Sequence, residues 1–338
     1  MTTADGLRAL DDACGSVLAA DMPAALPALR AIPDDALDGD EAAVRRRILE
    51  RFDRPTPPPS TFHSGDAVAD AIGAAFERTW WLGLTDPSSR VANEAVLLAT
   101  LRKVVGSDAA TMDDLEPTVQ ATLRDRGLHS LMGITWPFRE LMAWRHQETR
   151  TYDVPLPHGP FTVRAELLDD FVTFGWAHYA TAGRRATGGW ATTDALYAVV
   201  PRYTDSLDGE PFTITFLGHE TQHFADLTRH GPLEPWRLEY RSKLVEMAMA
   251  DETRRMRLDR FAQSQSDDPA AQHPYANRLI LRTLSAQLGL PTDDVTPAAL
   301  ASGLASVPGD RLRAAARAVL DADTATLPER AEAPATSG

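Results

Sequence analysis

The amino-acid sequence predicts an α+β protein that is predominantly α-helical. Apolar residues recur at three- to four-residue spacing through residues 1–150 and again after residue 211, which is typical of amphipathic helices. Residues 151–201 instead hold β-branched and aromatic runs, separated by turn signals such as "PHGP", that predict several short strands. We therefore expect a helical region at 1–150 and a second region, at 151–326, that begins with strands and returns to helix.

The helical region at 1–150 divides at a run of prolines. Its first helices lie within 1–53 and stop at "RPTPPPST", which cannot be helical and is interpreted as a linker over 54–61. Its later helices include "LMGITWPFRELMAWRHQE", whose apolar spacing predicts a helix over 131–148.

The second region contains the predicted strands "RTYDVPLP", "FTVRAELL", "FVTFGWAHYAT" and "ALYAVVPRY". Helical spacing follows in "FTITFLGHETQHFADL", in the long run from "EPWRLEY" to "DRFAQ", in "HPYANRLILRTLSAQLG" and in "DRLRAAARAVLDA". The polar tail over 327–338 is predicted to be disordered.

Composition and charge exclude several functions. With 338 residues and 43% apolar residues, the chain is long enough to bury a sizeable core. Its net charge of -14 argues against nucleic-acid binding, which requires clustered Lys and Arg. No stretch is apolar enough for a membrane span, Cys14 has no cysteine with which to pair, and the N-terminus lacks a signal peptide. These observations predict a cytoplasmic protein; they predict no oligomeric state.

The stretch "FLGHETQHFADL" carries the most specific chemical signal. His219 and His223 are four residues apart, so on one helix both imidazoles lie on the same face and can reach one metal ion. Glu220 follows the first histidine directly, which completes the pattern H-E-x-x-H, in which the glutamate activates water. A helical projection places both histidines among phenylalanines on the apolar arc, and the polar face with Thr221, Gln222 and Asp226 on the opposite side.

A catalytic zinc site needs a third protein ligand. Gly231 and Pro235 predict the end of one helix and the start of the next, with a short turn that makes the two antiparallel. A ligand level with His223 should then lie about four to seven residues into the second helix. Glu239 meets this condition, whereas Glu246 lies roughly 10 Å further along the axis and is the runner-up. The glutamate that does not bind is expected to be solvated or to orient a ligand histidine.

These residues resemble the gluzincins, HExxH zinc enzymes whose third ligand is a glutamate on the next helix. The resemblance covers "LGHETQHFAD" and "LEYRSKLVE" closely, and it implies a zincin-like catalytic domain over 151–326. The chain departs from the family in the short gap of 15 residues between His223 and Glu239, and in Lys243, where many members carry an aspartate. Donors for the developing oxyanion come from outside the two helices in such enzymes, and His273 and Tyr275 are the candidates here.

Three functions fit this pattern. The first is zinc-dependent hydrolysis of a peptide or amide, as in a metalloprotease, with Glu220 as the general base. The second is a non-heme Fe²⁺ oxygenase acting on a peptide or small molecule, because two histidines and one carboxylate also form its facial triad. Arg237 and Arg241, beside Glu239, are then candidates to bind a 2-oxo acid. The third is a non-catalytic metal-binding or regulatory protein.

Overall fold

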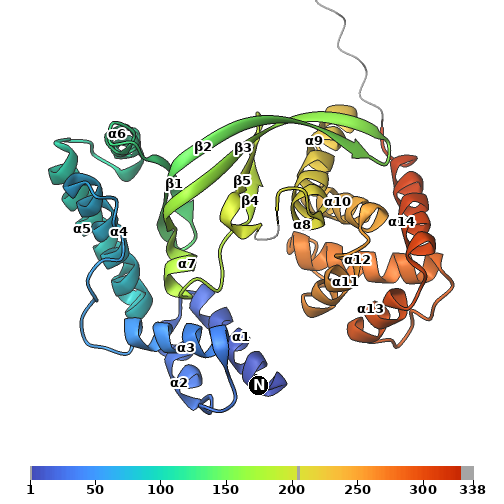
Figure 1. The fold of residues 1–338 in the computed structure, drawn as a ribbon, viewed down its shortest axis with the longest axis horizontal. Coiled ribbons are helices and arrows are strands. Elements are labelled where there is room, and N and C mark those ends of the chain that lie inside the picture. Colours follow the sequence, from blue (N-terminus) through green and yellow to red (C-terminus); the bar gives the residue numbers. More distant parts are fainter. Residues whose placement is uncertain (1, 204–205, 329–338) are drawn as a thin grey trace, which may run out of the picture. The chain divides into compact units, whose positions relative to one another are not determined.

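The computed structural model describes residues 2–203 and 206–328, and it is an α+β fold (Figure 1). In chain order the helices and strands are α1 (Ala4–Leu18), α2 (Met22–Ala31), α3 (Gly39–Phe52), α4 (Ala67–Thr85), η1 (Pro87–Ser89), α5 (Arg90–Val105), α6 (Met112–Arg124), β1 (His129–Thr135), β2 (Phe138–Leu156), β3 (Gly159–Phe174), α7 (Trp176–Ala180), β4 (Gly189–Ala191), β5 (Leu196–Val199), η2 (Val200–Arg202), α8 (Glu210–Phe212), η3 (Thr213–Gly218), α9 (His219–His230), α10 (Pro235–Met249), α11 (Arg254–Gln263), α12 (Gln272–Gln287), α13 (Pro297–Ala305) and α14 (Gly309–Thr324). Helix predominates, as the sequence predicts.

The chain forms two compact units that interleave along the sequence. Unit 1 comprises Met1–Gln147 and Leu168–Thr187, and unit 2 comprises Glu148–Leu167 and Gly188–Gly338. The unit changes after Gln147, close to the expected division near residue 150, but this is not a single boundary, and the strands already begin at His129. The chain enters unit 2 through the end of β2, returns to unit 1 within β3, and enters unit 2 again at Gly188.

The strands form one five-stranded sheet in the order β1-β2-β3-β5-β4. β1 and β2 are antiparallel, in register from His129 opposite Trp144 to Thr135 opposite Phe138. β4 is an edge strand and pairs with β5 from Gly189 opposite Ala198 to Ala191 opposite Leu196. The predicted strands within 151–201 are thus confirmed, although the segment from Trp176 to Ala180 is the short helix α7.

The helix predicted over 131–148 is wrong, because this segment forms most of β1 and the first half of β2. Pro137 lies in the two-residue turn between the strands, where it interrupts any helix. Residues 140–144 of β2 are all buried, so both faces of the strand are covered and the usual two-residue alternation is missing. Such a continuous apolar run is easily mistaken for a helix.

The proline-rich stretch 54–61 is irregular, as predicted, but it lies inside unit 1 and is fixed there. The Glu77 carboxylate on α4 accepts hydrogen bonds of 2.7 Å from the Ser60 hydroxyl and from the Thr61 amide. Phe62 is fully buried against Gly73, where an added Cβ would lie 2.0 Å from the phenylalanine ring. The predicted tail over 327–338 lies outside the described residues beyond Pro328.

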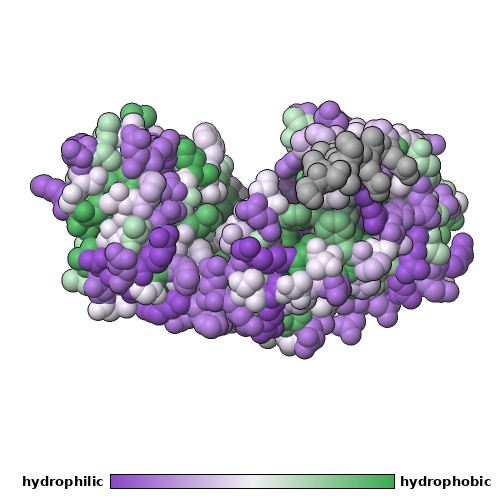
Figure 2. Space-filling view, turned by 90° about the horizontal axis from the view of Figure 1, so that it is seen from above, coloured by the Kyte–Doolittle hydropathy of each residue, from purple (hydrophilic) through white to green (hydrophobic). Residues whose placement is uncertain are grey.

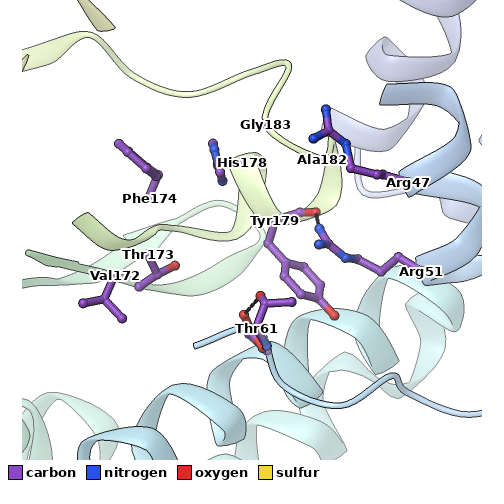
Figure 3. Close-up of a pocket in the computed structure, with 11 residues that line it drawn as sticks. Arg47, Arg51, Thr61, Val172, Thr173, Phe174, His178, Tyr179, Ala182 and Gly183 are labelled. Atoms are coloured by element: carbon purple, nitrogen blue, oxygen red, sulfur yellow. Dashed lines mark hydrogen bonds between the residues drawn. The ribbon is translucent and has the colours of Figure 1, made fainter. Parts of the chain in front are cut away.

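A cavity of about 300 Å³ opens within unit 1 beside the short helix α7 (Figure 3). The Arg51 guanidinium lies 4.3 Å from the centre of the Tyr179 ring and donates to the Tyr179 carbonyl. Arg47, one turn earlier on α3, and His178 also line the space. These contacts anchor α7 against α3.

Unit 2 is built around α10, which packs against α9, α12 and α14. Its core takes apolar residues from all four helices and from β3 and β5. The face of the protein in Figure 2 is mostly hydrophilic, with scattered hydrophobic residues. Among the described residues, no helix has both the length and the apolar character that crossing a membrane demands.

Glu140 on β2 gives unit 1 a pH-dependent stability. Its carboxylate is only 8% exposed and accepts hydrogen bonds from the backbone amides of Trp176, at 2.9 Å, and Leu141, at 3.1 Å. Burial raises the pKa of Glu140 to about 7, although these hydrogen bonds act in the opposite direction. The protonated form therefore stabilises the fold below the ordinary carboxyl pKa, and this contribution is lost as the pH rises through about 7.

We expect the free energy of unfolding of the Glu140→Gln variant to increase, relative to that of the unmodified protein, as the pH rises from 5 to 8. The change should be on the order of 2 kcal/mol, because each pKa unit corresponds to about 1.4 kcal/mol. Denaturant unfolding followed by tryptophan fluorescence at both pH values measures it. A difference in unfolding free energy that is the same at pH 5 and pH 8 would contradict the assignment.

Candidate metal centre

The helix pair predicted from the sequence is present. α9 ends at His230, and Gly231 follows it with φ 77°, a conformation in which glycine is favoured. α10 begins at Pro235, as expected for proline at the first helical position. A π-helical segment, η3, precedes α9 directly, so the histidine helix starts after a wider turn than the regular helix assumed from the sequence.

A buried ion pair holds α9 and α10 in register. Arg241 is fully buried and donates from Nε and Nη2 to the two oxygens of Asp226, each at 2.8 Å. The Gln222 amide donates to Asp226 at 2.7 Å, and Arg241 also reaches Asp323 on α14 at 2.8 Å. Such a two-pronged arginine–carboxylate contact fixes relative position as well as charge balance.

This network corrects the predicted orientation of α9. The helix buries Thr221, Gln222 and Asp226, which the helical projection placed on the solvent side, and exposes 42% of Leu227. The projection weighed side chains by hydropathy alone, whereas Arg241 supplies the partner that makes burial of Asp226 possible. His219 still lies inside, but among polar groups.

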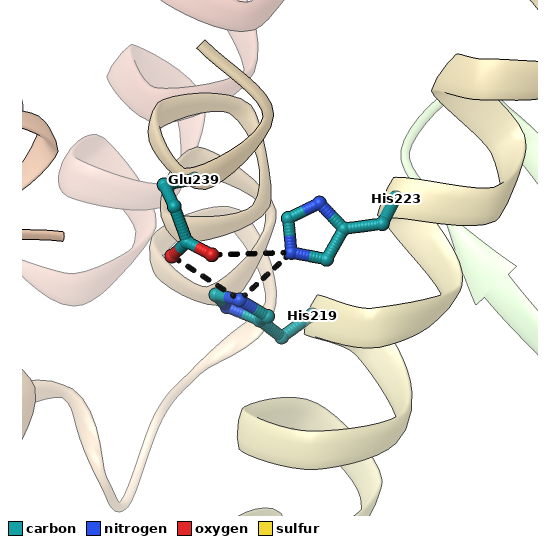
Figure 4. A group of neighbouring side chains, drawn as sticks. All are labelled: His219, His223 and Glu239. Carbon is teal, nitrogen blue, oxygen red and sulfur yellow. Dashed lines mark hydrogen bonds and ion pairs between the residues drawn. The ribbon is translucent and has the colours of Figure 1, made fainter. Parts of the chain in front are cut away.

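His219, His223 and Glu239 come together between the two helices (Figure 4). The Nε2 atoms of the histidines are 3.2 Å apart. Glu239 Oε2 lies 3.5 Å from His219 Nε2, and its Oε1 lies 3.5 Å from His223 Nε2. In a tetrahedral zinc site with bonds of about 2.0–2.1 Å, ligand atoms lie about 3.3–3.4 Å apart. The observed separations therefore fit a single zinc-sized ion.

The second nitrogen of each histidine also fits metal binding. His219 Nδ1 lies 2.5 Å from Glu246 Oε1, and His223 Nδ1 lies 3.4 Å from the Ser242 hydroxyl. A carboxylate on Nδ1 keeps the proton there and leaves the Nε2 lone pair for a metal. Glu246 is fully buried and ion-paired with Arg257. Glu246 therefore orients His219, which is one of the two roles expected from the sequence for the glutamate that does not bind the metal.

The pKa shifts show how strongly these groups are coupled. Burial would lower the pKa of His219, but Glu239 and Glu246 outweigh it and raise the value to about 9. Burial would raise the pKa of Glu239, yet hydrogen bonds from His219, His223 and His273 bring it far below the usual range. A proton on His219 thus helps to balance the buried carboxylates, and a bound cation would take over this role by displacing it.

A cavity of about 320 Å³ opens beside the cluster and is lined by His219 and Glu220. Lys243 and His273 also line it. Lys243 donates to Glu239 Oε2 at 2.6 Å, and His273 Nδ1 lies 2.7 Å from the same oxygen. The expected catalytic group Glu220 and one expected oxyanion donor, His273, therefore share a cavity with a metal-ligand candidate. Tyr275 packs against Trp236 at a ring distance of 5.4 Å and is not among the residues that line this cavity.

Several residues at the site were not predicted from the sequence as functional residues. Lys243 was recognised only as a departure from a family pattern, yet it contacts Glu239 directly. Arg257 and Arg260 on α11 line the cavity, and their only sequence signal is the basic run "RRMRLDR". Tyr203 lies near enough to Glu220 that its pKa, raised first by burial, is raised further by that carboxylate. Nothing in the sequence pattern distinguishes Tyr203 from a core tyrosine.

Comparison with known proteins adds no assignment, because no family model, curated protein or solved structure matches the chain. The function is therefore inferred from the geometry of this site.

We expect Glu239 and Glu246 to differ in their effect on zinc binding. Glu239→Ala removes a ligand and should nearly abolish stoichiometric zinc. Glu246→Gln keeps the fold of the helix but weakens the orientation of His219, which typically costs about 10- to 100-fold in affinity. Chelator-competition titrations measure both effects, and Glu252→Gln, at an exposed position, is the matched control. Full zinc retention by Glu239→Ala would refute this division of roles.

Proposed function

We propose that the protein is a zinc-dependent hydrolase of peptide or amide bonds. The observation that carries the proposal is the shared cavity, in which Glu220 and His219 line the same space beside three converging ligand atoms. His219, His223 and Glu239 would hold the ion. A non-catalytic metal site has no need of a carboxylate in this position.

Zinc held there would polarise a substrate carbonyl and lower the pKa of water. Glu220 would accept a proton from the attacking water and deliver it to the leaving nitrogen. Its side chain is half-buried, so it reaches the cavity while keeping contact with solvent. Tyr203 stays protonated beside it, because burial and the charge of Glu220 both raise the tyrosine pKa, and it donates to the Gly188 carbonyl at 2.8 Å.

His273 is the proposed donor to the developing oxyanion. It comes from α12, outside the two ligand helices, and its side chain is 60% exposed while Nδ1 lies 2.7 Å from Glu239 Oε2. Because its contact is with Glu239, a substrate oxygen at the ion would lie within reach of the same ring. We do not extend this role to Tyr275.

We further propose that unit 2 is a zincin-like catalytic domain in which β4 guides an extended substrate. β4 is an edge strand, a position at which an extended peptide can add to a sheet as a further strand. It also lies against the segment that leads into the histidine helix: a Cβ added to Gly189 would come within 2.4 Å of Phe216 on η3. The glycine allows this close approach.

An iron oxygenase is the second candidate, because the donor set of two imidazoles and one carboxylate suits Fe²⁺ as well. The arginines expected to bind a 2-oxo acid do not support it. Arg237 and Arg241 both pair with Asp323, and Arg241 is fully buried. Glu220 also has no required role in an oxygenase.

Elemental analysis of the purified protein discriminates between these functions. We expect about one equivalent of zinc, lost in His219→Ala and His223→Ala, because each change removes a ligand atom. Iron with oxygen-dependent turnover would favour the second candidate. Metal without turnover of any peptide or amide would leave a binding or regulatory role.

Glu220→Gln should retain zinc and lose hydrolysis, because an amide cannot accept the proton of water. The loss should be at least about 100-fold, within the range for general-base catalysis. Release of amines from a peptide mixture, measured at equal zinc content, tests it. Hydrolysis at the unmodified rate in this variant would rule out the mechanism.

A further inference from the structure

Three cationic side chains line the cavity beside the proposed metal centre. α10 contributes Lys243, and α11 contributes Arg257 and Arg260. Glu220 is the carboxylate among the lining residues. This concentration of positive charge stands in a protein whose net charge is -14.

Two further carboxylates lie behind the cavity wall, each paired with a lining cation, so that three cations and three carboxylates surround the cavity. The cations are Lys243, Arg257 and Arg260, and the carboxylates are Glu220, Glu239 and Glu246. Lys243 and Arg257 are paired with Glu239 and Glu246 respectively. A divalent ion would therefore leave the site with an excess of positive charge, which favours a substrate that brings an anion.

Polar atoms in the lining are also left without partners. Asn277 is only 7% exposed, and its Oδ1 has no hydrogen-bond partner among the described residues. The Thr215 hydroxyl and Arg257 Nε are also buried and have no hydrogen-bond partner within the described part of the chain. Buried polar atoms usually have partners, so these positions indicate a site that a polar ligand or water completes.

The distance from the metal ligands to Lys243 identifies where the anion would lie. Lys243 Nζ is 2.6 Å from Glu239 Oε2. A zinc ion held by this carboxylate would therefore lie close to the Lys243 ammonium group. One residue of extended chain spans about 3.3–3.6 Å, so an anion this close belongs to the residue next to the bond that is cut.

We propose that the substrate carries a free α-carboxylate one residue beyond the scissile amide, and that Lys243 and Arg260 bind it. This inference rests on the proposed hydrolase function and makes the protein an enzyme that releases single C-terminal residues. In the reaction one C–N bond breaks, the oxygen of water joins the acyl carbon, and a proton passes through Glu220 to the leaving amine. Peptides and N-acylated amino acids both present this group.

The binding experiment uses zinc-loaded Glu220→Gln protein, which should bind substrates without cutting them. The immobilised protein is offered a random peptide pool with free C-termini, the same pool with amidated C-termini, and N-acetyl amino acids with their amides. We expect free acids to be enriched about 10- to 100-fold over amides, as for a hydrogen-bonded charge. The enrichment should fall as ionic strength rises.

Arg260→Gln provides the matched variant, because Arg260 is exposed and its replacement leaves the core intact. It should lower the enrichment about tenfold. Arg255→Gln is the control, since Arg255 lies on the same helix, pairs with Asp259 and is not among the lining residues. If only N-acetyl amino acids are enriched, the carboxylate subsite stands and the substrate is a small molecule.

The inference would be overturned if the immobilised protein enriched the free acids and their amides equally, or if it bound neither. The proposed function is tested separately with the unmodified zinc protein. Cleavage of amidated peptides as fast as free acids, dependent on Glu220, would uphold the hydrolase and reject the carboxylate subsite. Absence of zinc would reject the hydrolase itself.

Discussion

The candidate site depends on the buried ion pair between Arg241 and Asp226. Both residues lie within one helical turn of ligand candidates: Asp226 follows His223 by three positions, and Arg241 follows Glu239 by two. The two-pronged contact therefore sets how far α10 slides along α9, and hence that Glu239 faces the Nε2 atoms of both histidines while Glu246 reaches only Nδ1 of His219. Breaking one partner of such a pair would leave an uncompensated buried charge, at a cost of about 3–5 kcal/mol. The pair is costly to lose, and it specifies one register among several.

The candidate metal centre lies at the end of a longer chain of charged groups that runs through unit 2. Asp323 of α14 meets Arg241, Glu246 connects His219 to Arg257, and Lys243 holds Glu239. Each of the two glutamates that contact the histidines is thus also paired with a cation: Glu239 with Lys243, and Glu246 with Arg257. This arrangement holds the candidate ligand side chains in place, which would lower the ordering cost of binding an ion.

The site was more predictable from the sequence than the fold around it. His219, His223 and Glu239 follow from local helix geometry, which a short turn and a proline at a helix start define well. The burial of Asp226 and the contacts of Lys243 depend on partners that are distant in sequence or specific to this chain, so periodicity does not reveal them. The strands over 129–148 were missed because both faces of β2 are covered near Leu141, and a fully buried strand has no alternating pattern. The high helix content and the strands after residue 150 could be predicted, because local residue propensities are sufficient to indicate them.

The interleaved path of the chain limits how the protein can be divided. Glu148–Leu167 belongs to unit 2 but is flanked on both sides by segments of unit 1. A fragment that starts at Gly188 would keep β5 and β4 but lose β3, the other neighbour of β5 in the sheet. The backbone groups of β5 that pair with β3 would then be exposed as a new sheet edge, which promotes aggregation. Neither joining two genes end to end nor inserting one coding sequence into the other is enough by itself to produce this alternation of four segments.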